Sequence, residues 1–349
     1  MIMTFFFKIS TFKHCILTLF VFLTKFFKTT YKSELKFVSM TQILEKIITD
    51  QNLAWDNTLQ NEMEKFYVAL SNATITELLE NRMNLEENSK NFINLQKEIE
   101  EFRKILLNGC GFFIIKNSCF SDFSEDEQKS IFSIISKILG TLYVQNIKNE
   151  KFVVITDEGK SMKTGGRYHQ TNQGGSYHTD SPQWKNAPDY IALLCIRPAK
   201  KGGTSKFLSA YSIHNKILQE NKTLLEQLYQ KFHFDKRSEF EESESPTIFE
   251  PIFQYKNEKL ALRYLRDYID GGHQIQNQPL TKTQFDALDY FDKISKDDNI
   301  AVSYDLKAGD MMFSNNHRVL HGRTPFDDFD DKNLKRYLIR TWIKDSSFS

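Results

Sequence analysis

The chain has 349 residues, of which 40% are hydrophobic and 26% are charged, the balance of an ordinary globular protein. Lysine and arginine (46) nearly cancel aspartate and glutamate (45), and no basic stripe or binding motif is present, so nucleic acid is not an expected partner. The four cysteines lack zinc-site spacing and are too few for a disulfide framework, which predicts reduced thiols and a cytoplasmic protein.

The first 39 residues differ from the rest of the chain. An apolar run of ten, CILTLFVFLT at 15–24, lies between two lysines and is shorter than the about 20 residues of a bilayer-spanning helix. It resembles the apolar part of a signal peptide, but no small-residue cleavage site follows. Because Met40 opens a helix-like sequence, we expect residues 1–39 to lie outside the mature fold. The alternative is a membrane tether through residues 13–27.

Residues 40–110 are predicted to form a helical segment that packs on the core. A helix starts at Met40, and a second is expected after a possible N-cap at Ser89, with a stop at Gly109. The apolar residues of this second helix recur at spacings of three and four: Phe92, Leu95, Ile99, Phe102 and Leu106.

From Cys110 onward the pattern favours strands. CGFFIIK (110–116) is rich in strand formers, and a helix follows from Ser124 to near Gly140. Further strands are predicted at 151–156, 190–196, 206–210, 310–315 and 336–343, with helices at 211–231 and 281–294. Many short strands separated by turn residues favour a sandwich or closed barrel, so residues 111–345 are expected to form one mainly β domain. The acidic stretch Glu239–Glu244 is predicted to be a solvated loop.

A possible metal site begins at SYHTDSPQW. Alternate side chains of a strand share a face, so His178 and Asp180 point toward one place. With one more histidine they form a 2-His-1-carboxylate triad, which leaves positions on Fe(II) open for substrates. An HxD pair alone is weak evidence, and a second one occurs at His233 and Asp235. His178 follows a Gly-Gly-Ser turn that suits a strand edge, whereas His233 follows a helical run and is predicted to be a surface or helix-end residue.

The second histidine is sought in NNHRVLHGRTPF. His321 stands between an apolar pair and Gly322, which predicts the end of a buried strand where the backbone turns sharply. His317 lies in a polar run after two asparagines, typical of a loop. The pattern favours His321, with His317 as the alternative.

Arginine and threonine supply candidates for binding a dicarboxylate co-substrate. A carboxylate is best held by the planar fork of an arginine, and Arg336 and Arg340 are spaced to share one side of a strand. Thr204 follows two glycines, and its hydroxyl is a second candidate contact, although a plain turn residue explains it equally well.

With these motifs in order, the chain resembles the taurine dioxygenase and clavaminate synthase-like family from about Gly111 to Ile343. The resemblance is carried by HTD (178–180), GGTS (202–205), AGDMMFSNNHRVLHGRTPF (308–326) and RYLIRTW (336–342). It implies a double-stranded β-helix, or jelly roll, with flanking and N-terminal helices. The family's N-x-R-x-x-H-G-R context around the distal histidine selects His321 over His317.

The resemblance also implies an activity. Members are Fe(II)- and 2-oxoglutarate-dependent dioxygenases that use O2 and release succinate and CO2. Carried over, the iron ligands are His178, Asp180 and His321, and the residues contacting 2-oxoglutarate are Thr204, Arg336 and Arg340. The stretch from His321 to Arg336 is longer than in taurine dioxygenase, which leaves the division of work between the two arginines open. Related halogenases lack the carboxylate, so Asp180 favours hydroxylation, desaturation or cyclisation.

The substrate is expected to be a small polar or carboxylate-bearing metabolite. Candidate substrate residues precede the metal motif or lie in LRYLRDY (262–268): Arg167, Gln170, Asn172, Arg263 and Arg266. A homo-oligomer is compatible with the sequence. The competing hypotheses are a non-catalytic jelly-roll protein and a metal enzyme of this fold that does not use 2-oxoglutarate.

Overall fold

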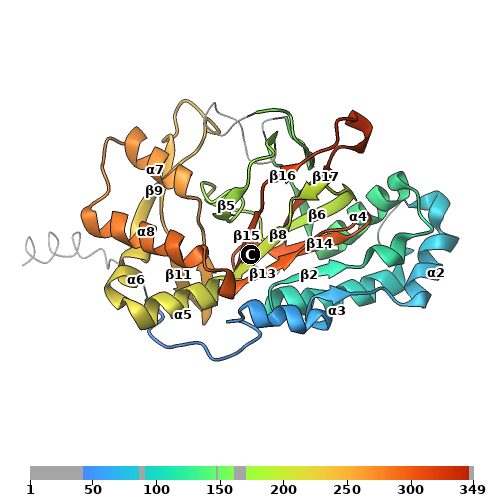
Figure 1. Cartoon of the computed structure of the whole chain (residues 1–349), viewed down its shortest axis with the longest axis horizontal. Helices are drawn as coiled ribbons and strands as arrows, with labels where there is room; N and C mark the ends of the chain where they lie inside the picture. Colours follow the sequence, from blue (N-terminus) through green and yellow to red (C-terminus); the bar gives the residue numbers. More distant parts are fainter. Residues whose placement is uncertain (1–41, 86–90, 147, 161–169, 346–349) are drawn as a thin grey trace, which may run out of the picture. The chain divides into compact units, whose positions relative to one another are not determined.

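A computed structural model describes residues 42–85, 91–146, 148–160 and 170–345. The chain divides into two compact units, residues 1–42 and 43–349, and the second holds the helices and strands that follow (Figure 1). The predicted extension 1–39 lies outside the described residues, as do the predicted cap Ser89 and the predicted substrate residue Arg167.

The predicted helix from Met40 is wrong for the described part of that stretch, because residues 42–56 contain no helix. Leu44 is buried, and its amide donates to the hydroxyl of Tyr229. The backbone of Ile48 makes two hydrogen bonds with the side chain of Asn215, at 3.0 and 2.7 Å. Tertiary contacts thus pair backbone groups that a helix would otherwise satisfy, and they override the local helical pattern.

Three helices precede the strand-rich region. They are α2 (Asn72–Glu80), α3 (Ile93–Asn108) and α4 (Glu125–Leu139). The predicted stop of α3 at Gly109 is confirmed. The predicted start of α4 is also confirmed, since Ser124 caps it and the side chain of Glu127 returns a bond to the Ser124 amide, a capping box. Short 3-10 helices span Asn57–Asn61, Met63–Lys65, Arg82–Asn84, Asn117–Phe120, Asp298–Ile300 and Lys332–Leu334.

The larger sheet has seven strands within the described residues, in the order β1-β2-β14-β6-β17-β3, with β4 also paired to β17. Its strands are β1 (Tyr67–Val68), β2 (Phe112–Ile115), β14 (Met311–Asn315), β6 (Tyr190–Arg197), β17 (Tyr337–Lys344), β3 (Thr141–Tyr143) and β4 (Phe152–Ile155). The strands predicted at 110–116, 151–156, 190–196, 310–315 and 336–343 are therefore confirmed.

Both faces of the larger sheet are buried, and alternation assigns each side chain to a face. On β2, Phe113 and Ile115 pack with the core beneath α3 and α4, whereas Phe112 and Ile114 join a second core on the opposite face. Phe112 stacks on Phe207 of the smaller sheet, with ring centroids 4.5 Å apart. The second core therefore lies between two sheets, and we call that side of each sheet its inner face.

The smaller sheet has the order β13-β8-β15-β5, from β13 (Ala301–Tyr304), β8 (Ser205–Ser209), β15 (Val319–Arg323) and β5 (Gly175–His178). Its outer face carries Leu208 and Leu320, which pack in a third core with three helices: α5 (Ala210–Glu220), α6 (Lys222–Leu228) and α8 (Lys282–Ser295). The helix predicted at 211–231 is thus two helices, divided at Asn221, whose side chain caps the second.

Three two-stranded pairs complete the described strands: β9 (Lys231–Asp235) with β10 (Thr247–Pro251), β11 (Phe253–Lys256) with β12 (Lys259–Leu262), and β7 (Lys201–Gly202) with β16 (Phe326–Asp327). Helix α7 (Arg266–Ile275) packs against β9. His233 was predicted to be a surface or helix-end residue; the helix-end alternative is wrong, because α6 stops early enough for strand β9 to form, and His233 is half-buried on that strand.

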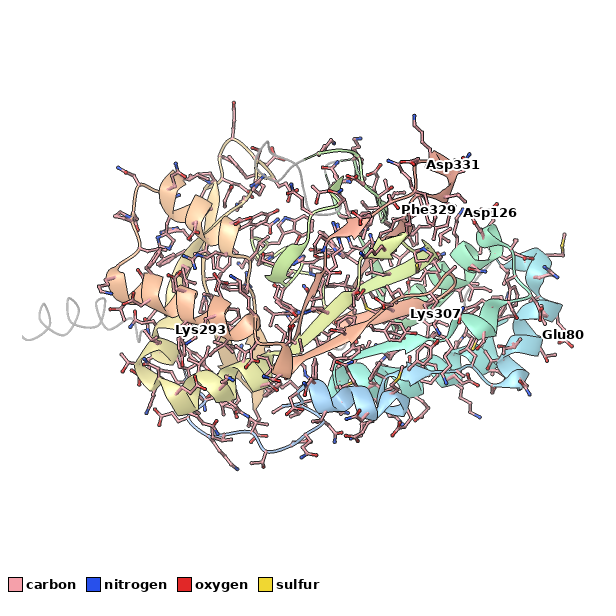
Figure 2. All side chains as sticks on the ribbon, viewed as in Figure 1. Glu80, Asp126, Lys293, Lys307, Phe329 and Asp331 are labelled. Atoms are coloured by element: carbon pink, nitrogen blue, oxygen red, sulfur yellow. The ribbon has the colours of Figure 1, made fainter. Side chains whose placement is uncertain are left out.

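The fold is mixed α and β, with helices on the outer faces of two sheets that pack through a shared inner core. Charged side chains such as Glu80, Asp126 and Asp331 are exposed and project outward (Figure 2). Among the described residues, no helix has both the length and the apolar character needed to cross a bilayer.

A buried histidine on α5 makes the stability of this fold sensitive to acid. His214 is fully buried against Phe253, and burial lowers its pKa from 6.5 to about 4. Below pH 6.5 the unfolded chain binds a proton that the folded chain rejects, so stability is lost as the pH falls toward 4. Between pH 7.5 and 5.0 we expect His214 to account for a loss of about 2 kcal/mol.

The measurement is urea unfolding of the wild type and of His214→Phe at both pH values. The variant keeps an aromatic ring beside Phe253 and has no proton to take up, so its free energy of unfolding should fall less across this range. Equal losses in the two proteins would contradict the assignment.

Candidate metal centre

Two histidines meet across a strand pair. Strands β5 and β15 run antiparallel, and His178 and His321 are direct partners in their register. Both side chains lie on the inner face, with ring centroids 4.4 Å apart. His321 is in the middle of β15 and not at a strand end as predicted. Gly322 explains the difference, since a Cβ there would come within 3.3 Å of the carbonyl oxygen of Gly175 on β5.

Asp180 follows β5 and completes a cluster of three potential ligands. Its Oδ1 is 3.6 Å from Nε2 of His178 and 3.6 Å from Nε2 of His321. The three ligand atoms lie within 4.8 Å of one another, and the described residues contain no other such group of three. Two imidazoles and one carboxylate on one side of a cavity are the donor set that suits Fe(II) with open positions. The donor set therefore fits the metal predicted from the sequence.

The protonation states also suit a metal. Burial opposes the charged form of Asp180, but Arg340 and the hydrogen bonds from His178 and His321 hold its pKa well below the ordinary value. Burial and the neighbouring His178 lower the pKa of His321. Nδ1 of His178 lies 2.8 Å from the carbonyl oxygen of Ser176, which can only accept, so Nδ1–H donates to it and Nε2 faces the cluster.

The second carboxylate oxygen of Asp180 is held by two donors on β17. The indole Nε1 of Trp342 donates to Oδ2 over 2.6 Å, and Nη1 of Arg340 donates to the same atom over 3.1 Å. Nε of Arg340 also donates to Oε1 of Gln145, at 2.8 Å. Neither Trp342 nor Gln145 was assigned a role from the sequence: Trp342 ends the RYLIRTW motif but was predicted only as part of a strand, and Gln145 lies in no motif.

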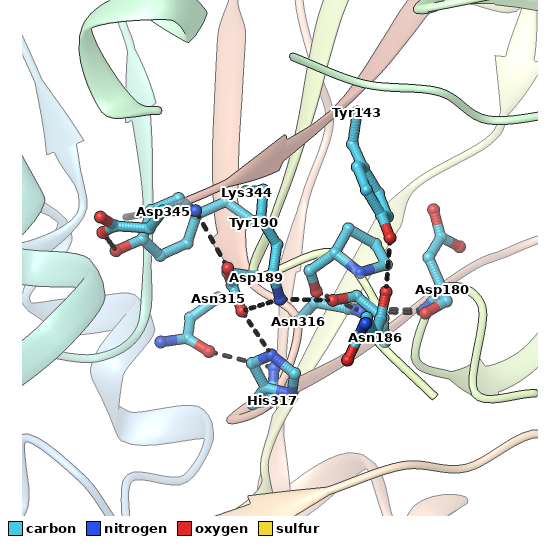
Figure 3. A network of polar contacts seen from close by, with 12 residues as sticks. Tyr143, Asp180, Asn186, Asp189, Tyr190, Asn315, Asn316, His317, Lys344 and Asp345 are labelled. Atoms are coloured by element: carbon cyan, nitrogen blue, oxygen red, sulfur yellow. Dashed lines mark hydrogen bonds and ion pairs between the residues drawn. The ribbon is translucent and has the colours of Figure 1, made fainter. Parts of the chain in front are cut away.

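The asparagine and arginine of the distal motif have structural roles. The side chain of Asn316 accepts from the amide of Asp180 at 2.8 Å and donates to its carbonyl at 2.9 Å, which fixes the backbone of that residue (Figure 3). Arg318 donates to the carbonyls of Leu106 and Gly109 at the end of α3. The two residues thus stabilise the backbone around the site, Asn316 at Asp180 and Arg318 at the end of α3.

His317 is occupied elsewhere. Its Nε2 lies 3.0 Å from Oδ1 of Asp189, in a network with Lys344 (Figure 3). His233 of the second HxD pair contacts Thr247 and Gln278. The structure therefore places His321 beside His178 and Asp180, whereas His317 and His233 lie elsewhere.

The predicted co-substrate arginines differ in their surroundings. Arg336 is 5% exposed, and its Nη1 is buried with no hydrogen-bond partner among the described residues. Its guanidinium lies 5.1 Å from the ring of Phe326, and burial lowers its pKa. The guanidinium of Arg340 instead donates hydrogen bonds to Asp180 and Gln145. Arg336 forms no ion pair among the described residues, although the charge of Asp328 partly opposes the effect of burial on its pKa, whereas Arg340 is paired with Asp180.

One cavity joins the cluster to these arginines. It is lined by the three potential ligands, by apolar side chains of both sheets and by Arg323, Arg336 and Arg340. Thr204 is not among its lining residues, but it follows Gly203, where a Cβ would lie 3.3 Å from Nε of Arg336. The amide of Thr204 bonds to the hydroxyl of Thr324.

A second cavity shares His178, Asp180 and Arg340 with the first. Its other polar lining includes Gln183 and Glu239, and Oε2 of Glu239 accepts from the indole of Trp184 at 2.9 Å. Residues 239–244 contain no helix or strand, as predicted, and the first of them, Glu239, is half-buried and faces this cavity. The neighbours Glu241 and Glu242 are exposed.

The predicted substrate residues within the described chain lie away from both cavities. Gln170 bonds to Glu158, and Asn172 is exposed. Arg263 donates to the carbonyls of Pro182 and Trp184, which supports the loop after the metal motif. Arg266 forms ion pairs with Asp270, Asp289 and Asp292. These contacts are structural, and the local sequence gave no means to foresee them.

Comparison with known proteins places these features in context. FR-33289 synthase from Streptomyces rubellomurinus is 29% identical over 319 residues, covering 87% of this chain and 92% of the relative. Taurine hydroxylase-like protein SAT17 from Stachybotrys chartarum is 26% identical over 168 residues, covering 47% of this chain and 40% of the relative.

Solved structures share the fold. An asparagine oxygenase in complex with Fe(II), 2S,3S-3-hydroxyasparagine and succinate matches with a TM-score of 0.62 at 16% identity, covering 80% of this chain and 93% of that one. The non-haem iron oxygenase OrfP in complex with Fe and alpha-ketoglutaric acid matches with a TM-score of 0.58 at 14% identity, covering 80% and 94%.

The family comparison agrees with the geometry of the cluster. Residues 77–342, which include all three potential ligands and both co-substrate arginines, match the family described as taurine catabolism dioxygenase TauD, TfdA family. The chain therefore belongs to the TauD/TfdA family of dioxygenases and is an oxidoreductase of the iron- and 2-oxoglutarate-dependent kind.

Proposed function

We propose that the protein hydroxylates a small polar or carboxylate-bearing metabolite, using Fe(II), 2-oxoglutarate and O2 and releasing succinate and CO2. One observation carries the proposal: the cluster of His178, Asp180 and His321 opens into the same cavity as the buried, unpartnered Nη1 of Arg336. That cavity offers a metal at one end and a cation for a carboxylate at the other, as a dicarboxylate co-substrate requires.

The proposed roles follow from the contacts. His178, Asp180 and His321 hold iron, which supplies the oxidising chemistry when bound. Arg336 binds the far carboxylate of 2-oxoglutarate; a second contact from the hydroxyl of Thr204 stays a prediction, because Thr204 does not line the cavity. Arg340 orients Asp180 through their ion pair and borders the co-substrate at its metal-binding end. The unpartnered Nη1 of Arg336 and the ion pair of Arg340 support this division of work between the two arginines.

The second cavity is the proposed substrate site. It reaches His178 and Asp180 from the side away from Arg336, so a substrate there lies beside the metal without competing for the co-substrate cation. Gln183 and Glu239 give it polar walls. The asparagine oxygenase that shares the fold was solved with a hydroxylated amino acid, which supports a small polar substrate for this chain as well.

The finer architectural predictions remain proposals. We infer that the two sheets are the halves of a double-stranded β-helix spanning residues 111–345, which their shared inner core and antiparallel pairing support. A cytoplasmic location is supported by the buried free thiols of Cys110, Cys119 and Cys195. A homo-oligomer stays a prediction.

Removal of a proposed ligand tests the metal site. His178→Ala should weaken anaerobic Fe(II) binding by more than about 100-fold and abolish succinate release, because the site loses a directly bonded donor. Fe(II) titration under reducing conditions measures the first effect. His233→Ala, from the second HxD pair, is the matched control and should leave both unchanged. Wild-type affinity in His178→Ala would refute the assignment, and a non-catalytic protein would show no succinate release at all.

Removal of the proposed carboxylate contact tests the co-substrate. Arg336→Gln should raise the KM for 2-oxoglutarate by at least about 30-fold, since a buried charge pair loses one partner. Succinate release is measured against 2-oxoglutarate concentration, with Arg82→Gln as control, because Arg82 forms an exposed ion pair with Glu127 away from the site. Full activity of Arg336→Gln without added 2-oxoglutarate would favour the 2-oxoglutarate-independent alternative.

A further inference from the structure

The two oxygens of the Asp180 carboxylate have different surroundings. Oδ1 faces the two histidines, at 3.6 Å from each Nε2. Oδ2 faces β17 and accepts from Trp342 at 2.6 Å and from Arg340 at 3.1 Å. The carboxylate is 5% exposed, so neither oxygen has bulk water as an alternative partner. The two oxygens are therefore not interchangeable.

The ring of Trp342 is held in place on three sides. Its backbone pairs with Ile191 of β6 and with Tyr143 of β3, so the residue sits within the sheet and not at an edge. The ring of Trp184 meets it edge-on, with centroids 5.3 Å apart, and the guanidinium of Arg340 lies 4.7 Å from its centroid. The indole N–H is thus aimed at Oδ2 by packing as well as by the bond itself.

The number of Asp180 carboxylate oxygens that bind iron decides how many coordination positions of the iron remain open for 2-oxoglutarate and O2. A carboxylate with two free oxygens can bind a metal through both, whereas a 2-His-1-carboxylate triad leaves three positions only if each protein ligand contributes one atom. A 2-oxo acid occupies two positions and O2 needs a third. The two donors on Oδ2, from Trp342 and Arg340, engage its lone pairs and so compete with the metal for that oxygen.

We propose that Trp342 is a positioning residue that restricts Asp180 to one-oxygen coordination and so keeps three iron positions open. The inference rests on the proposed function, since it presumes that the cluster binds iron. Arg340 assists, but its donors are shared with Gln145. The indole has one N–H and no acceptor atom, so it can only donate, and its bond to Oδ2 is the shorter of the two.

The test compares Trp342→Phe with Trp184→Phe in the full chain, loaded with Co(II) without oxygen. Trp342→Phe removes the N–H but keeps a ring against Trp184 and Arg340. Trp184→Phe alters the same aromatic contact but leaves the bond to Asp180 intact, because the Trp184 indole donates to Glu239. The readouts are the Co(II) absorption spectrum, which reports coordination number, and the affinity of the Co(II) protein for 2-oxoglutarate.

For Trp342→Phe we expect an altered Co(II) spectrum and 2-oxoglutarate affinity about 10- to 100-fold weaker, the usual effect of losing a hydrogen bond to a metal ligand. Trp184→Phe should match the wild type in both. A second variant carries 3-benzothienylalanine at position 342, in which sulfur replaces the N–H within the same ring shape. It should show the same altered Co(II) spectrum and the same weaker 2-oxoglutarate affinity. If the phenylalanine variant folds poorly, this variant alone supplies the test.

Three results would overturn the proposal. Wild-type spectra and affinities in the benzothienyl variant would reduce Trp342 to a packing role. Equal defects in Trp184→Phe would attribute the effect to aromatic packing and not to the N–H. Failure of the wild type itself to bind Co(II) would reject the proposed metal site and this inference together, which separates that failure from the other two.

Discussion

The antiparallel pairing of β5 with β15 is the constraint on which the site depends. It places His178 directly opposite His321, so that two imidazoles from distant parts of the chain share one inner face. A shift of one residue in that register would send one ring to the outer core, where Leu320 and Leu208 lie. The register shifts just beyond this pair, between His321 and Arg323, where a Cβ on Gly322 would lie 3.3 Å from the carbonyl oxygen of Gly175. The geometry of the candidate metal centre is therefore a consequence of strand register.

The inner face of β17 provides the other half of the site. Leu338 belongs to the core between the sheets, and alternation puts Arg340 and Trp342 on the same side. Their donors meet the one buried carboxylate of the cluster, which compensates the cost of removing Asp180 from water. Arg336 precedes the strand and keeps an unpaired donor. Strand β17 and the residue before it therefore supply two cations, Arg340 already paired with Asp180 and Arg336 still available for a carboxylate.

Much of this arrangement was predictable from local pattern. Alternation predicted the strands, and an HxD pair with an H-G-R block predicted three residues that lie within 4.8 Å of one another. What could not be predicted depends on contacts between distant residues. In the sequence, Trp342 is indistinguishable from any aromatic residue of a strand, and only the fold shows that its indole donates to Asp180. Arg266 was predicted to bind substrate, but in the fold it forms ion pairs with three aspartates.

The same limit explains the errors. The stretch after Met40 has a helical pattern, but Tyr229 and Asn215 supply hydrogen-bond partners for its backbone, and residues 42–56 form no helix. Glu239 belongs to the predicted acidic loop, but a hydrogen bond from the indole of Trp184 places it at a cavity wall, which the sequence did not indicate. In each case the deciding partner is tens to hundreds of residues away, so no window of local sequence contains the information.

The separation of the ligands along the chain has a consequence for how the protein matures. Because His178 and His321 approach only when β5 and β15 have paired, an unfolded chain has no high-affinity metal site. Metal that binds only the native state stabilises it by RT ln(1 + [M]/Kd), so iron supply and folding are thermodynamically linked. Pairings of such long range also form slowly. In an iron-poor cell, the population of folded protein would fall together with its activity.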